Sequence, residues 1–284
     1  MAKTQTSMSQ TNQPVISIVP PQGWGKLASQ ELWEYRELLW FWTLRGIKAR
    51  YRQMALGPLW VLLNPIIYML IFSVVFGGLA KLPSEGVPYP VFTYTALLPW
   101  HYFFDVVNFS STSLLREKEV MSKIYFPRLI FPVSTAIDAF IDLMVAFLVL
   151  IALMFYYGIA PSWHIWTLPL YVLFAGATAL SVGLWCATIM VRFRDLQHAI
   201  SYGLSAFMYA TPVAYSATLI PERWLWLYQL NPMYWVIEGW RWSLLGIGQP
   251  PQPYMLVSLL IVVFLLISGL YIFQHQERTI ADWI

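Results

Sequence analysis

The sequence predicts an all-α polytopic membrane protein with six transmembrane helices. Of its 284 residues, 58% are hydrophobic and only 11% are charged, whereas about a quarter of the residues in an average soluble domain are charged. A helix needs ~20 residues to cross a bilayer core of ~30 Å, and apolar runs of about this length recur along the chain. The predicted spans cover residues 59–79, 91–113, 132–157, 167–191, 198–219 and 253–273.

The chain before the first span divides into a polar tail and an amphipathic helix. Residues 1–32 lack an apolar core, so we expect a flexible cytoplasmic tail and not a cleaved signal peptide. Residues 33–57 predict a helix in the membrane interface, with an apolar stripe in lipid and basic side chains reaching the headgroups. The stripe is Trp40, Leu44, Ile47, Tyr51, Met54 and Ala55, and the basic residues are Arg45, Lys48, Arg50 and Arg52. Gly57 and Pro58 end this helix.

The distribution of basic residues predicts the topology of the six-span domain, residues 58–273. An even number of spans puts both termini on one side of the membrane. Fourteen of the 17 Lys and Arg residues fall on that side, and Lys81, Arg223 and Arg241 fall on the other. Because cytoplasmic segments carry the excess of basic residues, we expect both termini, including a short tail at 274–284, to be cytoplasmic.

Residues 220–247, between the fifth and sixth spans, have an unusual pattern. They are rich in aromatic residues and are interrupted by Pro221 and Pro232. The two apolar pieces, about 222–230 and 233–246, are too short to span a membrane, which favours re-entrant or interfacial helices on the external side. An ordinary external loop with two surface helices is the alternative.

The sequence lacks the common signatures of catalysis and nucleotide binding. It contains no GxxxxGK[ST], GxGxxG, HExxH or GxSxG motif, and its four histidines have no metal-ligand spacing. We therefore expect no catalytic residue, no metal site and no cofactor in this chain. Any ATP-driven activity of this chain would require ATP and Mg to bind a separate ATPase chain.

Two pairs of polar residues lie within predicted spans. Asp138 and Asp142 are separated by four residues and share one helix face. Charged groups inside a span are costly and turn toward protein or water, so this pair predicts a helix–helix anchor or, alternatively, a polar lining or a proton-coupled site. We favour the anchor because Asp138 is only ~9 Å along the helix from Pro132 and is therefore near the cytoplasmic end of the span. His101 and Asp105 form a second such pair, expected near the external end of its span, with structural hydrogen bonding favoured over contact with a polar substrate.

The aromatic content of 17% is high. Part of it belongs to the interfacial belts of membrane proteins, but aromatic residues also occur inside the predicted spans. Aromatic faces stack on the C–H faces of sugars while hydroxyl and indole N–H groups bond sugar oxygens. The aromatic residues inside the spans therefore predict a pore that conducts sugars. For any single aromatic residue, packing or lipid contact is the favoured alternative.

The segment 113–132 alternates charged and apolar residues. This pattern predicts a short helix that docks on a cytoplasmic partner or else a surface turn.

Six segments in order resemble a known family. They are RGIKARYRQMALGPLW at 45–60, LLPWHYF at 97–103, KIYFPRLIFP at 123–132, VRFRDL at 191–196, TPVAYS at 211–216 and NPMYWVIEGWRWSLL at 231–245. Together they resemble the membrane (permease) subunit of polysaccharide-exporting ABC transporters, the group that exports O-antigen, capsule and teichoic acid. This resemblance implies a homodimeric channel in the inner membrane, two ATP-binding cassette subunits and a lipid-linked polysaccharide exported from the cytoplasm.

The resemblance also implies roles for individual residues. Contact with the carrier phosphate or lipid headgroups is expected for Arg45, Lys48, Arg50 and Arg52, because Arg and Lys suit phosphate. Contact with the ATPase subunits is expected for Glu117, Lys118, Lys123, Tyr125, Phe126 and Arg128. The expected channel lining is Tyr68, Phe72, Phe104, Tyr202, Tyr209 and Tyr215. The expected external gate is Trp224, Trp226, Tyr234, Trp235, Glu238 and Arg241.

Three other functions remain open at this point. A related ABC permease for drugs or lipids has the same plan of spans. A secondary transporter would use buried charges such as Asp138 and Asp142 near the midplane. A membrane enzyme of lipid-linked sugars would need a cluster of oxygen ligands for a divalent metal, and the acidic residues Glu117, Glu119 and Asp195 of the predicted cytoplasmic loops are well separated.

Overall fold

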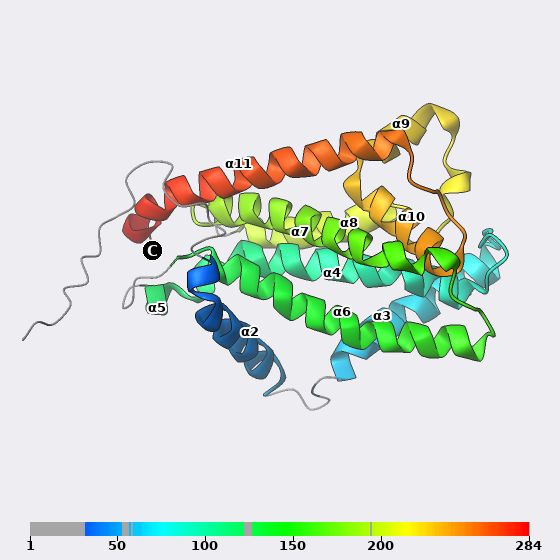
Figure 1. The fold of residues 1–284 in the computed structure, drawn as a ribbon, viewed down its shortest axis with the longest axis horizontal. Coiled ribbons are helices and arrows are strands. Elements are labelled where there is room, and N and C mark those ends of the chain that lie inside the picture. The colour runs from blue at the N-terminus through cyan, green and yellow to red at the C-terminus, as the bar shows by residue number, and fades with distance from the viewer. Residues whose placement is uncertain (1–31, 53–56, 58, 122–126, 194, 284) are drawn as a thin grey trace, which may run out of the picture.

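A computed structural model describes residues 32–52, 57, 59–121, 127–193 and 195–283, with side chains up to residue 276. All regular elements in these residues are helices. They form one elongated bundle (Figure 1). The predicted N-terminal tail, apart from Leu32, lies outside the described residues.

Most helices lie close to the segments that the sequence predicts as helical. They are α2 (Arg36–Tyr51), α3 (Leu59–Phe72) with its π-helical continuation η1 (Ser73–Leu79), α4 (Tyr89–Arg116), α5 (Lys118–Met121), α6 (Ile130–Tyr156), η2 (Trp163–Thr167), α7 (Leu168–Met190), α8 (Leu196–Tyr209), η3 (Ala217–Leu219), α9 (Glu222–Leu230), α10 (Pro232–Leu245) and α11 (Pro253–Trp283). Figure 1 shows α2, α5 and the C-terminal end of α11 at one end of the bundle and α9 and α10 at the other.

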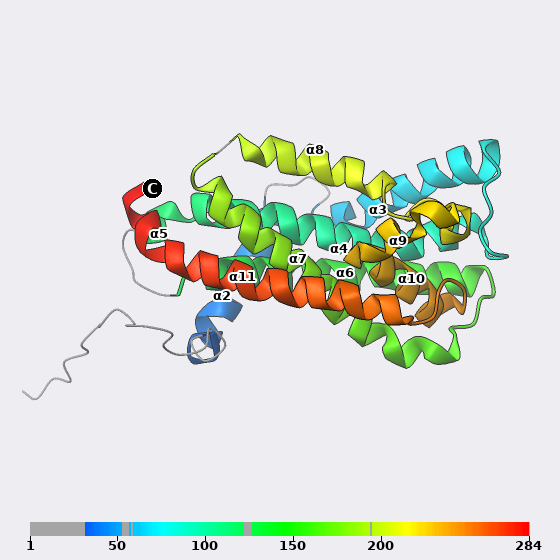
Figure 2. The same ribbon diagram turned by 90° about the horizontal axis from the view of Figure 1, so that it is seen from above.

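Helix α4 forms the centre of the bundle. It packs against α3, α6, α7, α8 and α10, and it lies between its neighbours in both views (Figures 1 and 2). Most of its residues are buried although many are Ser or Thr. Their hydroxyls donate to carbonyl oxygens one turn earlier, as Thr95 does to Val91 at 2.7 Å, so the polar atoms are satisfied without water.

Four helices of the described residues are long and apolar enough to cross a membrane, namely Leu59–Leu79, Ile130–Tyr156, Trp163–Met190 and Pro253–Gln276. They correspond to the first, third, fourth and sixth predicted spans. The second predicted span lies in α4, which is long enough but less apolar. The fifth lies in α8, which has 14 residues. The count of six therefore stays a prediction.

Two helix ends differ from the predicted ones. The predicted span 198–219 stops being helical at Tyr209, because Pro212 restricts the preceding residue to non-helical conformations. At the other end of the chain, α11 continues to Trp283, so residues 274–283 extend the last helix where the sequence analysis expected a separate tail. No Gly or Pro follows Gly269, so no helix-breaking residue stops α11 there.

The contact between α4 and α7 depends on a glycine. A Cβ atom added to Gly183 would lie 2.8 Å from the Cβ atom of Ser110. We expect Gly183→Ala to lower the melting temperature of the purified protein in detergent, because overpacking costs about 1–3 kcal/mol. Gly203→Ala is the matched control, since nothing lies within 4 Å of its added Cβ. An equal or higher melting temperature for Gly183→Ala would contradict this packing.

Candidate functional site

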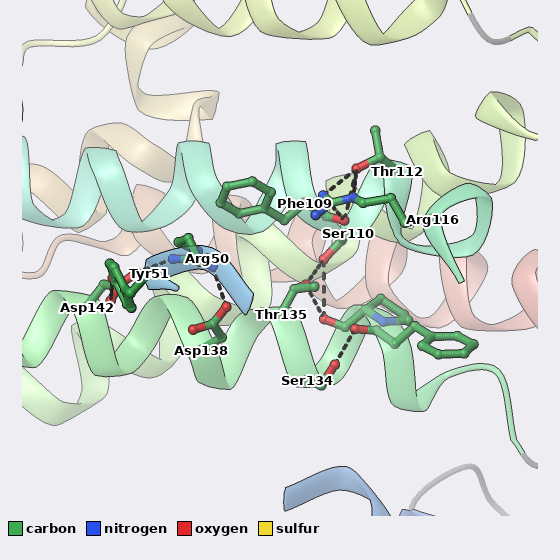
Figure 3. A network of polar contacts seen from close by, with 12 residues as sticks. Arg50, Tyr51, Phe109, Ser110, Thr112, Arg116, Ser134, Thr135, Asp138 and Asp142 are labelled. Atoms are coloured by element: carbon green, nitrogen blue, oxygen red, sulfur yellow. Dashed lines mark hydrogen bonds and ion pairs between the residues drawn. The ribbon is translucent and has the colours of Figure 1, made fainter. Parts of the chain in front are cut away.

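A buried charged cluster joins α2 to α6 (Figure 3). The two terminal nitrogens of Arg50 form ion pairs with Asp138 and Asp142, and the Tyr51 hydroxyl donates to Oδ1 of Asp142 at 2.7 Å. The side chains of Arg50, Asp138 and Asp142 are only 20%, 6% and 14% exposed. The aspartate pair therefore anchors one helix to another, which is the role that the sequence analysis favoured.

The contact between α2 and α6 includes a glycine and an aromatic pair. Gly46 faces α6, and a Cβ atom there would lie 3.5 Å from Oδ2 of Asp138, an ordinary contact distance. Trp42 packs edge-on against Phe131 with ring centroids 5.3 Å apart. Burial, together with the hydrogen bond to Asp142, raises the pKa of the Tyr51 hydroxyl, so this hydroxyl remains protonated and keeps donating.

The structure separates the four basic residues that were expected to act together. Arg50 points inward, with Phe109 beneath its guanidinium at 4.8 Å, and is not available to headgroups. Arg45, Lys48 and Arg52 are exposed. The expected phosphate or headgroup contact is therefore corrected for Arg50 and stays a prediction for the other three.

Arg45 also links α2 to the segment after α4, which was expected to contact an ATPase. It forms an ion pair of 2.9 Å with Glu117, just beyond the end of α4. Lys118 begins the short helix α5 and is exposed, and Arg128 is partly buried. Lys123, Tyr125 and Phe126 lie outside the described residues. The helix α2 and the segment after α4 thus form one surface at this end of the bundle.

Arg116 joins this region although the sequence analysis gave it no role. Its side chain donates to Thr112 at 2.6 Å and lies 5.1 Å from the Phe109 ring, which Arg50 also contacts. Arg45, Arg50 and Arg116 line a cavity of about 510 Å³ between α2, α4 and α6. Only the packing of three helices brings these residues together, and no local sequence signal marks that convergence.

Helix α8 has a surface unlike those of the four long apolar helices. Leu204 and Met208 are its buried residues, whereas its exposed residues include polar ones, namely Gln197, His198, Tyr202, Ser205 and Tyr209. The exposed residues of α11, in contrast, are mostly apolar, with Leu256, Leu260, Phe264 and Ile267 as examples. Because polar groups inside a membrane face water or protein and not hydrocarbon, the outer face of α8 is suited to a polar pathway.

Between α8 and α4 runs a groove of about 480 Å³, the α4–α8 groove. It is lined by Phe104, Asp105, Asn108, Phe109, Thr112, Leu115, Arg116, Gln197 and Ser201. A hydrogen bond of 2.7 Å from the Ser201 hydroxyl to the Asn108 side chain holds the two helices together, and Figure 2 shows α8 alongside α4. The groove therefore continues the polar face of α8 onto α4.

The expected channel-lining aromatic residues fall into two groups. Tyr202 and Tyr209 on α8 are 76% and 55% exposed, and Tyr68, Phe104 and Tyr215 are partly exposed. Phe72, in contrast, is buried in the core, with its ring 6.3 Å from that of Tyr209. Phe72 thus supports the surface from beneath and does not line it.

The residues expected to form the external gate also fall into two groups, one exposed and one buried. Trp224 and Trp226 on α9 are exposed, whereas Tyr234, Trp235, Glu238 and Arg241 on α10 are buried in this chain's own core. The last four therefore hold α10 in place and do not form its outer surface. The two short helices themselves begin and end within a residue of the predicted pieces.

Arg241 is the centre of a network at this end of the bundle. It forms an ion pair of 3.1 Å with Glu238 and donates to the carbonyl oxygens of Val213 at 2.9 Å and Tyr215 at 3.3 Å. Its guanidinium lies 3.7 Å from the centre of the Phe92 ring. Arg241 thus joins α4, α10 and the turn after α8.

A helical bundle with several potential spans, a polar face along one side and a charged surface at one end is typical of a membrane transport protein. No group of three or more potential metal ligands lies together in the part of the chain that the structure describes. Residues 37–245 match the ABC-2 type transporter family, and the chain belongs to this family. The members of this family are membrane subunits that lack an ATPase site of their own.

Similar proteins match between 69% and 90% of this chain. The chain is 30% identical to the O-antigen export system permease protein RfbA of Myxococcus xanthus over 90% of this chain and 98% of that protein. It is 28% identical to the RfbA protein of Klebsiella pneumoniae, over 87% of this chain and 94% of the relative. The polysialic acid transport protein KpsM of Escherichia coli is 26% identical over 69% of this chain and 76% of its own length.

Proposed function

We propose that this chain is the membrane subunit of an ATP-driven exporter that moves a lipid-linked polysaccharide from the cytoplasm across the inner membrane. The observation that carries the proposal is the polar and aromatic face of α8, beside the α4–α8 groove, in a bundle whose four long apolar helices expose mainly apolar side chains. The names of the relatives, which refer to O-antigen export and polysialic acid transport, support a polysaccharide cargo.

The same proposal includes the assembly. A second copy of the chain faces α3 and α8, so that Tyr68, Phe104, Tyr202, Tyr209 and Tyr215 line a shared channel. Two ATP-binding cassette subunits, which hold ATP and Mg, bind the end of the bundle with α2 and α5. Glu117, Lys118, Lys123, Tyr125, Phe126 and Arg128 contribute to that contact.

The topology proposed here has six spans with both termini in the cytoplasm. The 28 residues of α4 extend ~42 Å at 1.5 Å per residue, which is sufficient to cross the core. Helix α8 with the turn after it is the fifth span. Helices α9 and α10 are re-entrant on the external side, and Trp224 and Trp226 gate the exit.

Deletion and complementation test this function. In a strain that lacks the gene, we expect surface polysaccharide to disappear and lipid-linked polysaccharide to accumulate in the cytoplasmic leaflet, and the full chain restores the surface polymer. Mass spectrometry of the chain purified from native membranes should identify an ATP-binding cassette partner. Normal surface polysaccharide in the deletion strain, or the absence of such a partner, would refute the proposal.

The proposed contact of Arg45 with the carrier phosphate has a matched control in the chain. Arg45→Ala is expected to reduce export severalfold while the melting temperature changes little, because an exposed ion pair such as Arg45–Glu117 contributes about 0–1 kcal/mol. Arg45→Lys keeps the positive charge at this position, so export should persist in that variant. An equal loss of export in both variants would show that the positive charge is not what export requires at position 45.

A further inference from the structure

The α4–α8 groove contains a carboxylate without a partner. Asp105 lies in the middle of α4, not near an end as the sequence analysis expected. Within the described residues it forms no hydrogen bond or ion pair. The nearest guanidinium, that of Arg50, is already paired with Asp138 and Asp142. Because an unpaired charge inside a membrane protein is costly and is typical of a functional site, Asp105 needs an explanation.

A second unsatisfied polar group lies one turn away. The Nε2 atom of His101 is buried and has no hydrogen-bond partner among the described residues. His101 and Asp105 together line a smaller cavity of about 180 Å³ beside the α4–α8 groove, on the side of α3. Two unsatisfied polar side chains on the same face of α4 indicate that this face meets something polar that the chain itself does not supply.

The rest of the groove matches one class of ligand. Gln197 offers an amide and Asp105 a strong acceptor, while Phe104 offers an aromatic ring. Asn108 and Ser201 are already bonded to each other and shape the groove. Sugars combine several hydroxyl donors with C–H faces that stack on aromatic rings. The volume of about 480 Å³ falls within the ~300–1,000 Å³ typical of small-molecule sites.

We propose that the α4–α8 groove is a sugar-binding subsite, in which Asp105 and Gln197 bond the hydroxyl groups of one or two sugar rings and Phe104 stacks on a ring face. This inference rests on the proposed function, since the sugars belong to the transported polysaccharide. The subsite recognises hydroxyl groups and not the phosphate of the carrier. It lies next to the cavity that Arg45 and Arg116 line, so the first sugars bind beside the carrier headgroup.

Photo-crosslinking in cells tests the contact directly. A benzoylphenylalanine residue is introduced at Gln197 and, as a control, at Leu260 on the apolar outer face of α11. We expect glycan-bearing adducts of the full chain at position 197 and none at 260. An adduct with a second copy of the chain alone, or no adduct at 197, would overturn the subsite.

Substitution of Asp105 separates binding from structure. Asp105→Leu is expected to lower the export rate about tenfold, the loss that one hydrogen bond to a charged group can cause, without lowering the melting temperature. Asp105→Asn should retain part of the rate because the amide still bonds hydroxyls. Ser268→Leu on α11 is the control and should leave export unchanged. A lower melting temperature for Asp105→Leu, or normal export, would count against the subsite.

Complementation by the unmodified chain distinguishes the two levels of the proposal. If the unmodified chain restores surface polysaccharide while the Gln197 and Asp105 results are negative, the export function holds and the subsite is refuted. If the unmodified chain restores nothing, the proposed function itself fails and the subsite fails with it.

Discussion

Arg241→Leu is expected to destabilise the protein more than any other single change considered. The substitution leaves Glu238 buried without its cation and removes the donors to the carbonyl oxygens of Val213 and Tyr215. Removing one partner of a buried ion pair costs about 3–5 kcal/mol, a large part of the ~5–15 kcal/mol that stabilises a typical protein. Size-exclusion chromatography in mild detergent should show aggregated or absent protein.

Two further variants make this prediction specific. Arg223→Leu on α9 removes an exposed arginine at the same end of the bundle and should leave the elution profile unchanged. The double variant Glu238→Met with Arg241→Leu should recover part of the stability, because a buried pair replaced by apolar residues leaves no charge unpaired. Equal behaviour of the Arg241 and Arg223 variants would show that the network contributes little.

Arg50→Leu is expected to release α2 from the bundle. Without this guanidinium, Asp138 and Asp142 repel each other one turn apart on α6. We expect a loss of about 2–4 kcal/mol, somewhat below that of a fully buried pair because a fifth of the Arg50 side chain is exposed to solvent. Amide hydrogen exchange should show this loss of stability as at least a tenfold decrease in the protection of the α2 amides.

Arg52→Leu is the matched control for this second prediction. Arg52 lies two residues further along the chain and is exposed, so its removal should leave the exchange of α2 unchanged. The triple variant in which Arg50, Asp138 and Asp142 are all replaced by Leu should regain protection. If Arg50→Leu leaves the α2 amides protected, α2 is held mainly by apolar contacts such as Trp42 with Phe131.

Local signals in the sequence predicted the elements that depend on local chemistry. The boundary between α9 and α10 illustrates this. Pro232 occupies the first position of α10, the side chain of Asn231 accepts from the N–H of Met233 at 3.0 Å, and Gly246 ends the helix with a φ of 71°. Each is a residue type that favours its position at a helix end, so the sequence alone located both short helices.

The parts that sequence analysis missed depend on contacts between distant segments. Arg50 and its two aspartates are about ninety positions apart in the chain. The four basic residues between positions 45 and 52 gave no sign that one of them turns inward. The burial of Arg241 likewise depends on carbonyl groups at positions 213 and 215. A charged residue near an aromatic run has the same local pattern whether it faces a channel or the core.

The anchoring of α2 on α6 has a mechanical consequence. Helix α6 has 27 residues and is therefore a rod of ~40 Å, with the anchor in its first half. The segment after the C-terminal end of α6 contacts α10. The N–H of Ser162 donates to the carbonyl of Leu244 at 2.9 Å, and His164 stacks on Trp242. A tilt of ~5° about one end of such a rod displaces the other end by ~3.5 Å. A force applied to α2 is thus transmitted through the stiff helix α6 to the opposite end of the molecule. Spin labels on α2 and α10 would measure the resulting change in the distance between these helices.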